Sequence, residues 1–173
     1  MSITLYDAVV KTYQQILPAV GGFLEKGKAH FDAESRDVQD AVGLKLAEDM
    51  LPLHFQVVSV VHHSMNALNS AASGEATPPD FKLAFDYAGL QGHVQTAIDA
   101  VRAADADAIN ALADNPVVFR MGNFEMPFTA SDYLLSFSMP NFYFHATTLY
   151  GLLRKEGVGL GKMDFLGPLR IKA

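Results

Sequence analysis

Hydrophobic residues recur every three or four positions in four long stretches of the chain, which is the spacing of one face of an α-helix. These predicted helices cover residues 5–28, about 49–69, 80 to about 101, and 129 to about 156. Pro18 lies inside the first helix and is expected to kink or break it. Asp49 is expected to cap the second helix, with Pro52 tolerated in its first turn. Thr129 and Asp132 resemble a capping box at the start of the fourth.

Just before the fourth helix the hydrophobic period changes from 3.6 to 2, which is typical of β-strands. A two-residue turn at Gly122-Asn123 would place Arg120 opposite Glu125 on one face and Met121 beside Phe124 on the other. The sequence therefore predicts an all-α fold, a four-helix bundle with a small β-hairpin inserted before the last helix.

Composition narrows the possible functions. The length of 173 residues suffices for one sizeable core, so we expect a single domain over residues 1–173. Half of the residues are hydrophobic and the net charge is −6, which excludes a disordered chain and argues against nucleic-acid binding. The chain has no cysteine, so thiolate metal sites and cysteine nucleophiles are excluded. Without signal-peptide features or a membrane-length apolar stretch, we expect a cytoplasmic protein with no membrane partner.

The chain contains six histidines, and helical phase separates them by face. In the second predicted helix, His54 lies at the centre of the apolar face and His62 lies on its flank. His63 falls on the opposite face together with Gln56 and Ser59, and we expect this face to be wet. The histidines expected at the surface are His30, His63 and His93.

The fourth predicted helix carries polar residues along the face that should be buried, namely Ser138, Asn141, His145 and Thr148. A buried polar group without a partner costs about 1–3 kcal/mol, so this stripe needs water, a ligand or a metal to satisfy it. Pro140 cannot donate a backbone hydrogen bond and opens the helix beside Asn141. The stripe is therefore a candidate binding site.

We expect His145 to face a histidine of the second helix and to hold a divalent metal with it, zinc or nickel, because neutral imidazole suits both ions. Asn141 would orient a bound water or supply a weak oxygen ligand, and Thr148 would complete the cofactor-binding or ligand-binding part of the site. The alternative is that these histidines are core residues bonded to a carbonyl or hydroxyl. The residues alone leave open which is right and whether His54 joins the site.

Two further patterns bear on partners and chemistry. Tyr143 and Tyr150 share the outward side of the fourth helix with Arg154, which favours a second copy of the chain as partner, and we expect a homodimer. The glycine-rich run 157–162 lacks the preceding strand of a phosphate-binding loop and is interpreted as a helix stop.

Several segments of the chain resemble an uncharacterised bacterial family, a domain of unknown function within the DinB/YfiT-like metalloenzyme superfamily. The matching segments are Tyr6-Asp7, Lys45 to Leu53, Asp132 to Leu135, Pro140 to His145, and Gly161 to Gly167. The resemblance spans nearly the whole chain. It implies a DinB/YfiT-like four-helix bundle that is often dimeric.

In that superfamily a metal is held by one histidine of helix 2 and by a His-x-x-x-His pair of the last helix. The resemblance carries the helix 2 ligand to His62, and it places the pair at Asn141 and His145, with asparagine in place of the first histidine. Characterised members include transferases and isomerases that use a low-molecular-weight thiol. One hypothesis is thus a metal-dependent enzyme with a degenerate site at His62 and His145. The other is a non-catalytic dimeric bundle that has lost the metal and binds a small ligand or serves as a scaffold.

Overall fold

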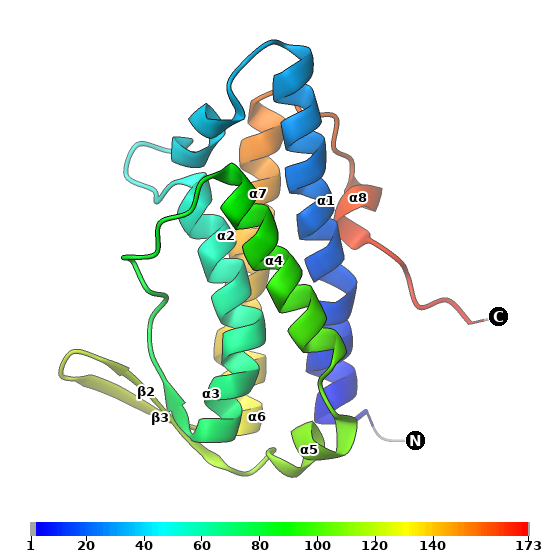
Figure 1. Ribbon diagram of the computed structural model, residues 1–173. Helices are drawn as coiled ribbons and strands as arrows, with labels where there is room; N and C mark the ends of the chain where they lie inside the picture. Colours follow the sequence, from blue (N-terminus) through cyan, green and yellow to red (C-terminus); the bar gives the residue numbers. More distant parts are fainter. Residues whose placement is uncertain (1–2, 173) are drawn as a thin grey trace.

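Four long helical segments lie side by side and make up most of the molecule (Figure 1). The computed structural model describes residues 3–172. The segments are α1 (Lys11–Ala33), α2 with α3 (Leu53–Val61 and Ala67–Ser73), α4 (Tyr87–Arg102) and α7 (Met139–Lys155). Both α1 and α2 pack against α4 and against α7. The mainly helical fold predicted from the sequence is thereby confirmed.

Three of these segments adjoin a π-helical turn, a rare widening of the helix that often occurs at functional sites. The turns are η1 (Tyr6–Val10), η3 (His62–Asn66) and η4 (Tyr133–Ser138). The shorter helices are η2 (Val38–Gly43), α5 (Ala106–Ala111), α6 (Ala130–Asp132) and α8 (Lys162–Leu166). Because η3 packs against α7 and η4 packs against α3, two of the irregular turns lie at one interface.

Several helix boundaries differ from the prediction. The helix is not broken at Pro18, and α1 continues to Ala33 because buried side chains before and after the proline hold both halves against the core. The second helix begins at Leu53 instead of following Asp49. Pro52 has an extended backbone, with ψ of 172°, so the chain enters the helix only after it.

The connection between β1 (Glu75–Ala76) and α4 is an extended strap, residues 77–86, and not the start of the third helix. Helix α4 begins only at Tyr87, because the Asp86 carboxylate provides its N-cap by accepting from the Gly89 amide at 2.7 Å. Asp80, predicted to open the helix, lies within the strap. The strap runs along the outside of α2 (Figure 1).

The predicted hairpin is present as β2 (Pro116–Met121) and β3 (Phe124–Thr129). Its register is the predicted one, with Arg120 opposite Glu125 and Met121 opposite Phe124. The Nε of Arg120 donates to Oε1 of Glu125 at 2.8 Å. A third strand, β1 (Glu75–Ala76), pairs in parallel with β2 and was not predicted, because two residues are too few to show a hydrophobic period.

Helix α2 is buried on the face that the sequence assigned to solvent. Gln56, Ser59 and His63 are only 2%, 0% and 4% exposed. The prediction is wrong because this face packs against α7, which also carries a polar stripe. The two stripes satisfy part of each other's hydrogen bonding, which lets the α2 stripe be both polar and buried, while Asn141 and His145 of the other stripe are half-buried.

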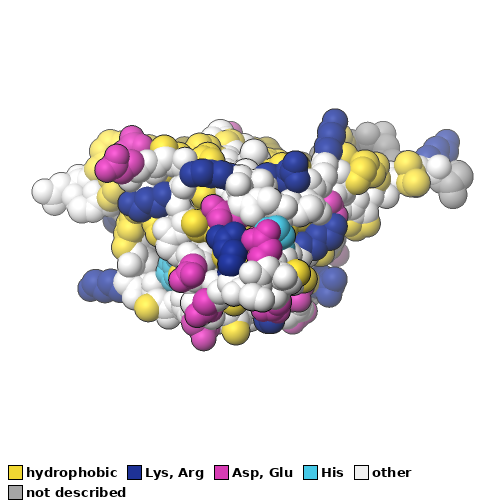
Figure 2. Space-filling view, turned by 90° about the horizontal axis from the view of Figure 1, so that it is seen from above, with side chains coloured by type: hydrophobic (Ala, Val, Ile, Leu, Met, Phe, Trp, Pro, Cys, Tyr) yellow, Lys and Arg dark blue, Asp and Glu magenta, His cyan; other side chains and the backbone are white. Residues whose placement is uncertain are grey.

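The surface mixes charges of both signs. At the end of the molecule where α1 and α7 end, basic and acidic side chains are interspersed (Figure 2). Arg36, just after α1, pairs there with Glu34 and with Glu156. None of the helices formed by residues 3–172 is both long enough and apolar enough to cross a membrane.

Candidate functional site

The first part of the site is the contact between α2 and α7. Gln56 donates its side-chain amide to the Leu51 carbonyl at 2.8 Å, which leaves its own oxygen as an acceptor. That oxygen lies 2.8 Å from Nδ1 of His145, so Nδ1 of His145 carries the proton and donates it. The Nε2 of His145 is therefore left with an unprotonated lone pair.

Two more histidines come from the π turn that follows α2. The rings of His62 and His63 meet edge to face with 5.0 Å between their centroids. The His63 ring stacks in turn on that of His145, with centroids 5.9 Å apart and planes 5° apart. We call these three residues the histidine cluster. In this cluster His63, which was predicted to face solvent, contacts His145. It lies between His62 and His145, the two predicted metal ligands.

The rings of His62 and His63 differ in their hydrogen bonding. The Nε2 of His62 lies 2.8 Å from the Thr77 carbonyl, which can only accept, so Nε2 carries the proton and Nδ1 keeps its lone pair. The Nδ1 of His63 is buried without a hydrogen-bond partner among the described residues. On the opposite side, the Ser138 hydroxyl donates to the His63 carbonyl at 3.0 Å.

Burial keeps the histidine cluster neutral. It lowers the pKa of His63 to about 3, with further contributions from His62 and His145. Burial likewise lowers the pKa of His145 to about 4, with a contribution from His62. The pKa of His62 is also lowered by burial, against the effect of its bond to the Thr77 carbonyl. Near pH 7 the cluster thus offers imidazole nitrogens as acceptors or ligands and carries no charge.

Three other predicted residues have side-chain contacts outside the cluster. Asn141 donates its amide to the Phe137 carbonyl at 2.7 Å, and the Thr148 hydroxyl donates to the Phe144 carbonyl at 2.8 Å, both within their own helical segment. The Nε2 of His54 accepts from the Phe85 amide of the strap at 3.1 Å. Within residues 3–172, no group of three or more His, Asp or Glu side chains is placed to hold one metal ion.

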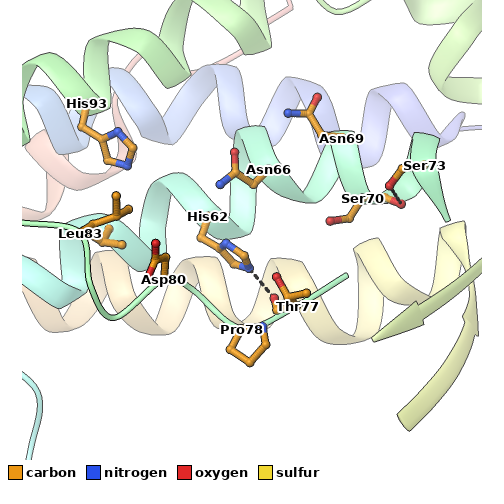
Figure 3. A pocket seen from close by; sticks show the side chains of 11 residues that line it. His62, Asn66, Asn69, Ser70, Ser73, Thr77, Pro78, Asp80, Leu83 and His93 are labelled. Carbon is orange, nitrogen blue, oxygen red and sulfur yellow. Dashed lines mark hydrogen bonds between the residues drawn. The ribbon is translucent and has the colours of Figure 1, made fainter. Parts of the chain in front are cut away.

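A polar cavity of about 340 Å³ opens on the other side of His62. Its polar walls come from η3 and α3, from the strap and from α4 (Figure 3). They include His62, Asn66, Asn69, Ser70, Asp80 and His93. The cavity was missed in the sequence, although polar residues at positions 62, 66, 69 and 73 follow the helical spacing and form a second stripe.

Several polar groups of this wall have no protein partner. Among residues 3–172, no hydrogen-bond partner lies against the side chains of Asn66, Asn69 or His93. The Asp80 carboxylate accepts from the Lys82 amide at 2.8 Å through one oxygen only. The cavity thus presents groups that are free to bind a solute.

Comparison with known proteins agrees with this architecture. A solved structure of a DinB family member protein from Shewanella denitrificans matches the chain with a TM-score of 0.80 and 23% sequence identity, covering 98% of this chain and 95% of that one. This likeness shows a shared fold. None of the curated proteins compared matches the chain. The pattern of the family described as a domain of unknown function, DUF1993, matches residues 5–166, which confirms the resemblance seen in the sequence. The chain therefore belongs to the DUF1993 family.

Proposed function

We propose that this protein binds a small polar molecule in the cavity between His62 and the strap. The observation that carries the proposal is the set of unpartnered polar side chains in the cavity wall, of which Asn66 and Asn69 are one helical turn apart on one helix face. Groups that converge on a cavity of a few hundred Å³ without bonding each other are typical of a ligand site.

His62 presents a ring of fixed orientation to this cavity. The Thr77 carbonyl holds the His62 ring in one tautomer, so the ring does not have to reorganise when a ligand arrives. We further infer that the four long segments form a DinB-like four-helix bundle. Its role in this proposal is to fix one wall, while the strap supplies the other.

A second candidate function is binding of a divalent metal, zinc or nickel, by His62 and His145. It is favoured by one observation: each ring donates its other N–H to an acceptor, Thr77 or Gln56, as metal-bound histidines commonly do. A bound ion would act there as a Lewis acid. The residues present fit only part of such a centre, because no group of three or more His, Asp or Glu side chains is placed to hold one ion among the described residues.

Nuclear magnetic resonance tests the first proposal. The protein is titrated with 5-amino-1-pentanol, 1,5-pentanediol and 5-hydroxypentanoate, three five-carbon molecules that differ at one end. We expect at least one to shift the amide resonances around Asn66, Asn69 and Thr77, and the double variant Asn66→Ala/Asn69→Ala to weaken that binding. The control Asn123→Ala, at the exposed hairpin tip, should bind like the wild type. If none of the three molecules moves these resonances, the proposal is wrong.

The metal candidate needs a separate measurement. Protein purified without a metal-affinity column is titrated with Zn²⁺ and Ni²⁺ in a calorimeter. Binding of one ion per chain that is lost in His145→Ala and kept in His30→Ala would support it. Binding that survives in His145→Ala would show that the ion sits elsewhere.

A further inference from the structure

We infer that the ligand of the polar cavity is a small organic cation that carries an amine. This inference rests on the proposed function and adds the chemical class of the ligand. It follows from the charge of the cavity wall and from which of its polar groups accept hydrogen bonds and which donate them.

The only carboxylate of the wall within the described residues belongs to Asp80. No lysine or arginine of the part of the chain that the structure describes lines the cavity. One oxygen of Asp80, whose side chain is exposed, accepts from the Lys82 amide, while its other oxygen has no protein donor among residues 3–172. A cavity with a single negative charge attracts a cation, whereas an anion would be placed beside Asp80 without a counter-charge.

One of the two histidines of the wall, His62, is an acceptor as well. Because the N–H of His62 is used on the Thr77 carbonyl, its remaining nitrogen, Nδ1, can accept a hydrogen bond but cannot donate one. Figure 3 shows the His62 ring bonded to Thr77 on the strap, with Asp80 further along the same strap. An ammonium group has three donors and no acceptor, so it matches a wall that offers His62 and Asp80.

The asparagines complete the match. Each amide of Asn66 and Asn69 presents a carbonyl oxygen and an NH₂ group, and neither amide is bonded to another of the described residues. They can bind the ammonium through their oxygens and a hydroxyl or carbonyl elsewhere in the ligand through their NH₂ groups. A neutral polyol would also bond to the asparagines, but it would gain nothing from the charge of Asp80.

The same five-carbon series tests the chemical class. We expect 5-amino-1-pentanol to bind at least tenfold more tightly than 1,5-pentanediol, and 5-hydroxypentanoate to bind most weakly. The variant Asp80→Asn should remove the preference for the amine while keeping the bond to the Lys82 amide, since the Asn oxygen can still accept it. The control Asp107→Asn, on the exposed side of α5, should keep the preference.

The outcomes separate the two proposals. If the diol or the hydroxy acid binds as tightly as the amine, or if Asp80→Asn retains the preference, the chemical class is wrong although the cavity is a ligand site. If none of the three binds, the proposed function fails, and the class falls with it. The charge of Asp80 would be further supported as the cause if high salt weakens binding of the amine to the wild type but has little effect on its binding to Asp80→Asn.

Discussion

At the scale of single residues, the Gln56–His145 bond decides the chemistry of the histidine cluster. Gln56 accepts from His145 only because its own amide is held by the Leu51 carbonyl. The glutamine therefore selects the tautomer in which Nε2 of His145 keeps a lone pair. Gln56, although polar and buried, is thus explained by the proton that it holds on Nδ1 of His145.

Replacing this acceptor should be costly. In Gln56→Leu the Nδ1–H of His145 loses its partner, and an unsatisfied buried donor costs about 1–3 kcal/mol. We expect the free energy of unfolding in urea to fall by that amount. Gln95→Leu, on the exposed side of α4, serves as the control and should change it by less than about 0.5 kcal/mol. An equal effect of both substitutions would contradict the assigned role.

The neutral histidines should also make stability depend on pH. In the unfolded chain they take up protons below pH 6.5, whereas in the folded protein the pKa is about 4 for His145 and about 3 for His63. The unfolded state thus binds more protons between these values, so the free energy of unfolding falls as pH falls from 6.5 to about 4. The slope is up to roughly 1.4 kcal/mol per pH unit for His63 and smaller for the half-buried His145.

Urea unfolding between pH 4 and 7 measures this slope. His63→Leu should lose about half of it or more, while His30→Gln should retain it. A His63→Leu curve parallel to that of the wild type would show that His63 is protonated in the folded protein at the same pH as in the unfolded chain.

At the scale of elements, the strap is attached to the helices mainly by two histidines. Most of its side chains are exposed, and its ends are tied by His62 at Thr77 and by His54 at Phe85. Between them, the Phe81 ring stacks on Phe55. Such a segment, with few buried contacts, opens more easily than the helices beneath it.

Loss of one of these two hydrogen bonds should therefore increase the opening of the strap before it affects the helices. In His54→Leu the Phe85 amide loses its acceptor, and we expect its hydrogen exchange to become about tenfold faster, which corresponds to roughly 1.4 kcal/mol. His93→Leu, which keeps the tie but removes the other ring stacked on Phe85, is the comparison. Exchange that accelerates equally in both variants would indicate that ring packing, and not the hydrogen bond, holds the strap.

The elements show which features a sequence can predict. The hairpin register and the Thr129 cap follow from residues a few positions apart, and both are present as predicted. The start of α4 was misplaced because Asp80 and Asp86 are both good caps, and only the path of the strap chooses between them. The burial of His63 was missed because the helical phase of α2 says which residues share a face, but not that α7 covers this face. Asn141 and His145 could be placed on one stripe, yet their hydrogen-bond partners depend on that packing as well.

At the scale of the whole molecule, side chains of α4 and α7 meet α1 at Gly27. A Cβ at this position would lie 2.6 Å from the hydroxyl of Tyr87 and 3.2 Å from Leu153. The Tyr87 hydroxyl cannot move freely, because it donates to the Leu24 carbonyl at 2.8 Å. The glycine thus sets the spacing of three of the four long segments.

Gly27→Ala should consequently destabilise the fold, although alanine favours helices. We expect a loss of about 1–3 kcal/mol from overpacking. Gly22→Ala is the matched control in the same helix, where a Cβ meets no atom within 4 Å, and it should gain about 0.5–1 kcal/mol. Thermal unfolding of the two variants compares them, and a stabilised Gly27→Ala would show that the helices can separate at little cost.

The two ties of the strap have opposite hydrogen-bond directions, and this makes them respond differently to acid. His62 donates to the strap and still donates when protonated, whereas His54 accepts and loses that ability on protonation. Acidification would therefore free the Phe85 end of the strap while the Thr77 end stays attached to His62. The cavity would then open at one end only. After correction for the pH dependence of intrinsic exchange, the protection of the Phe85 amide should then fall once the pH drops below the pKa of His54, which burial lowers, while the Thr77 end keeps its protection. An equal loss of protection at both ends would rule out this one-sided opening.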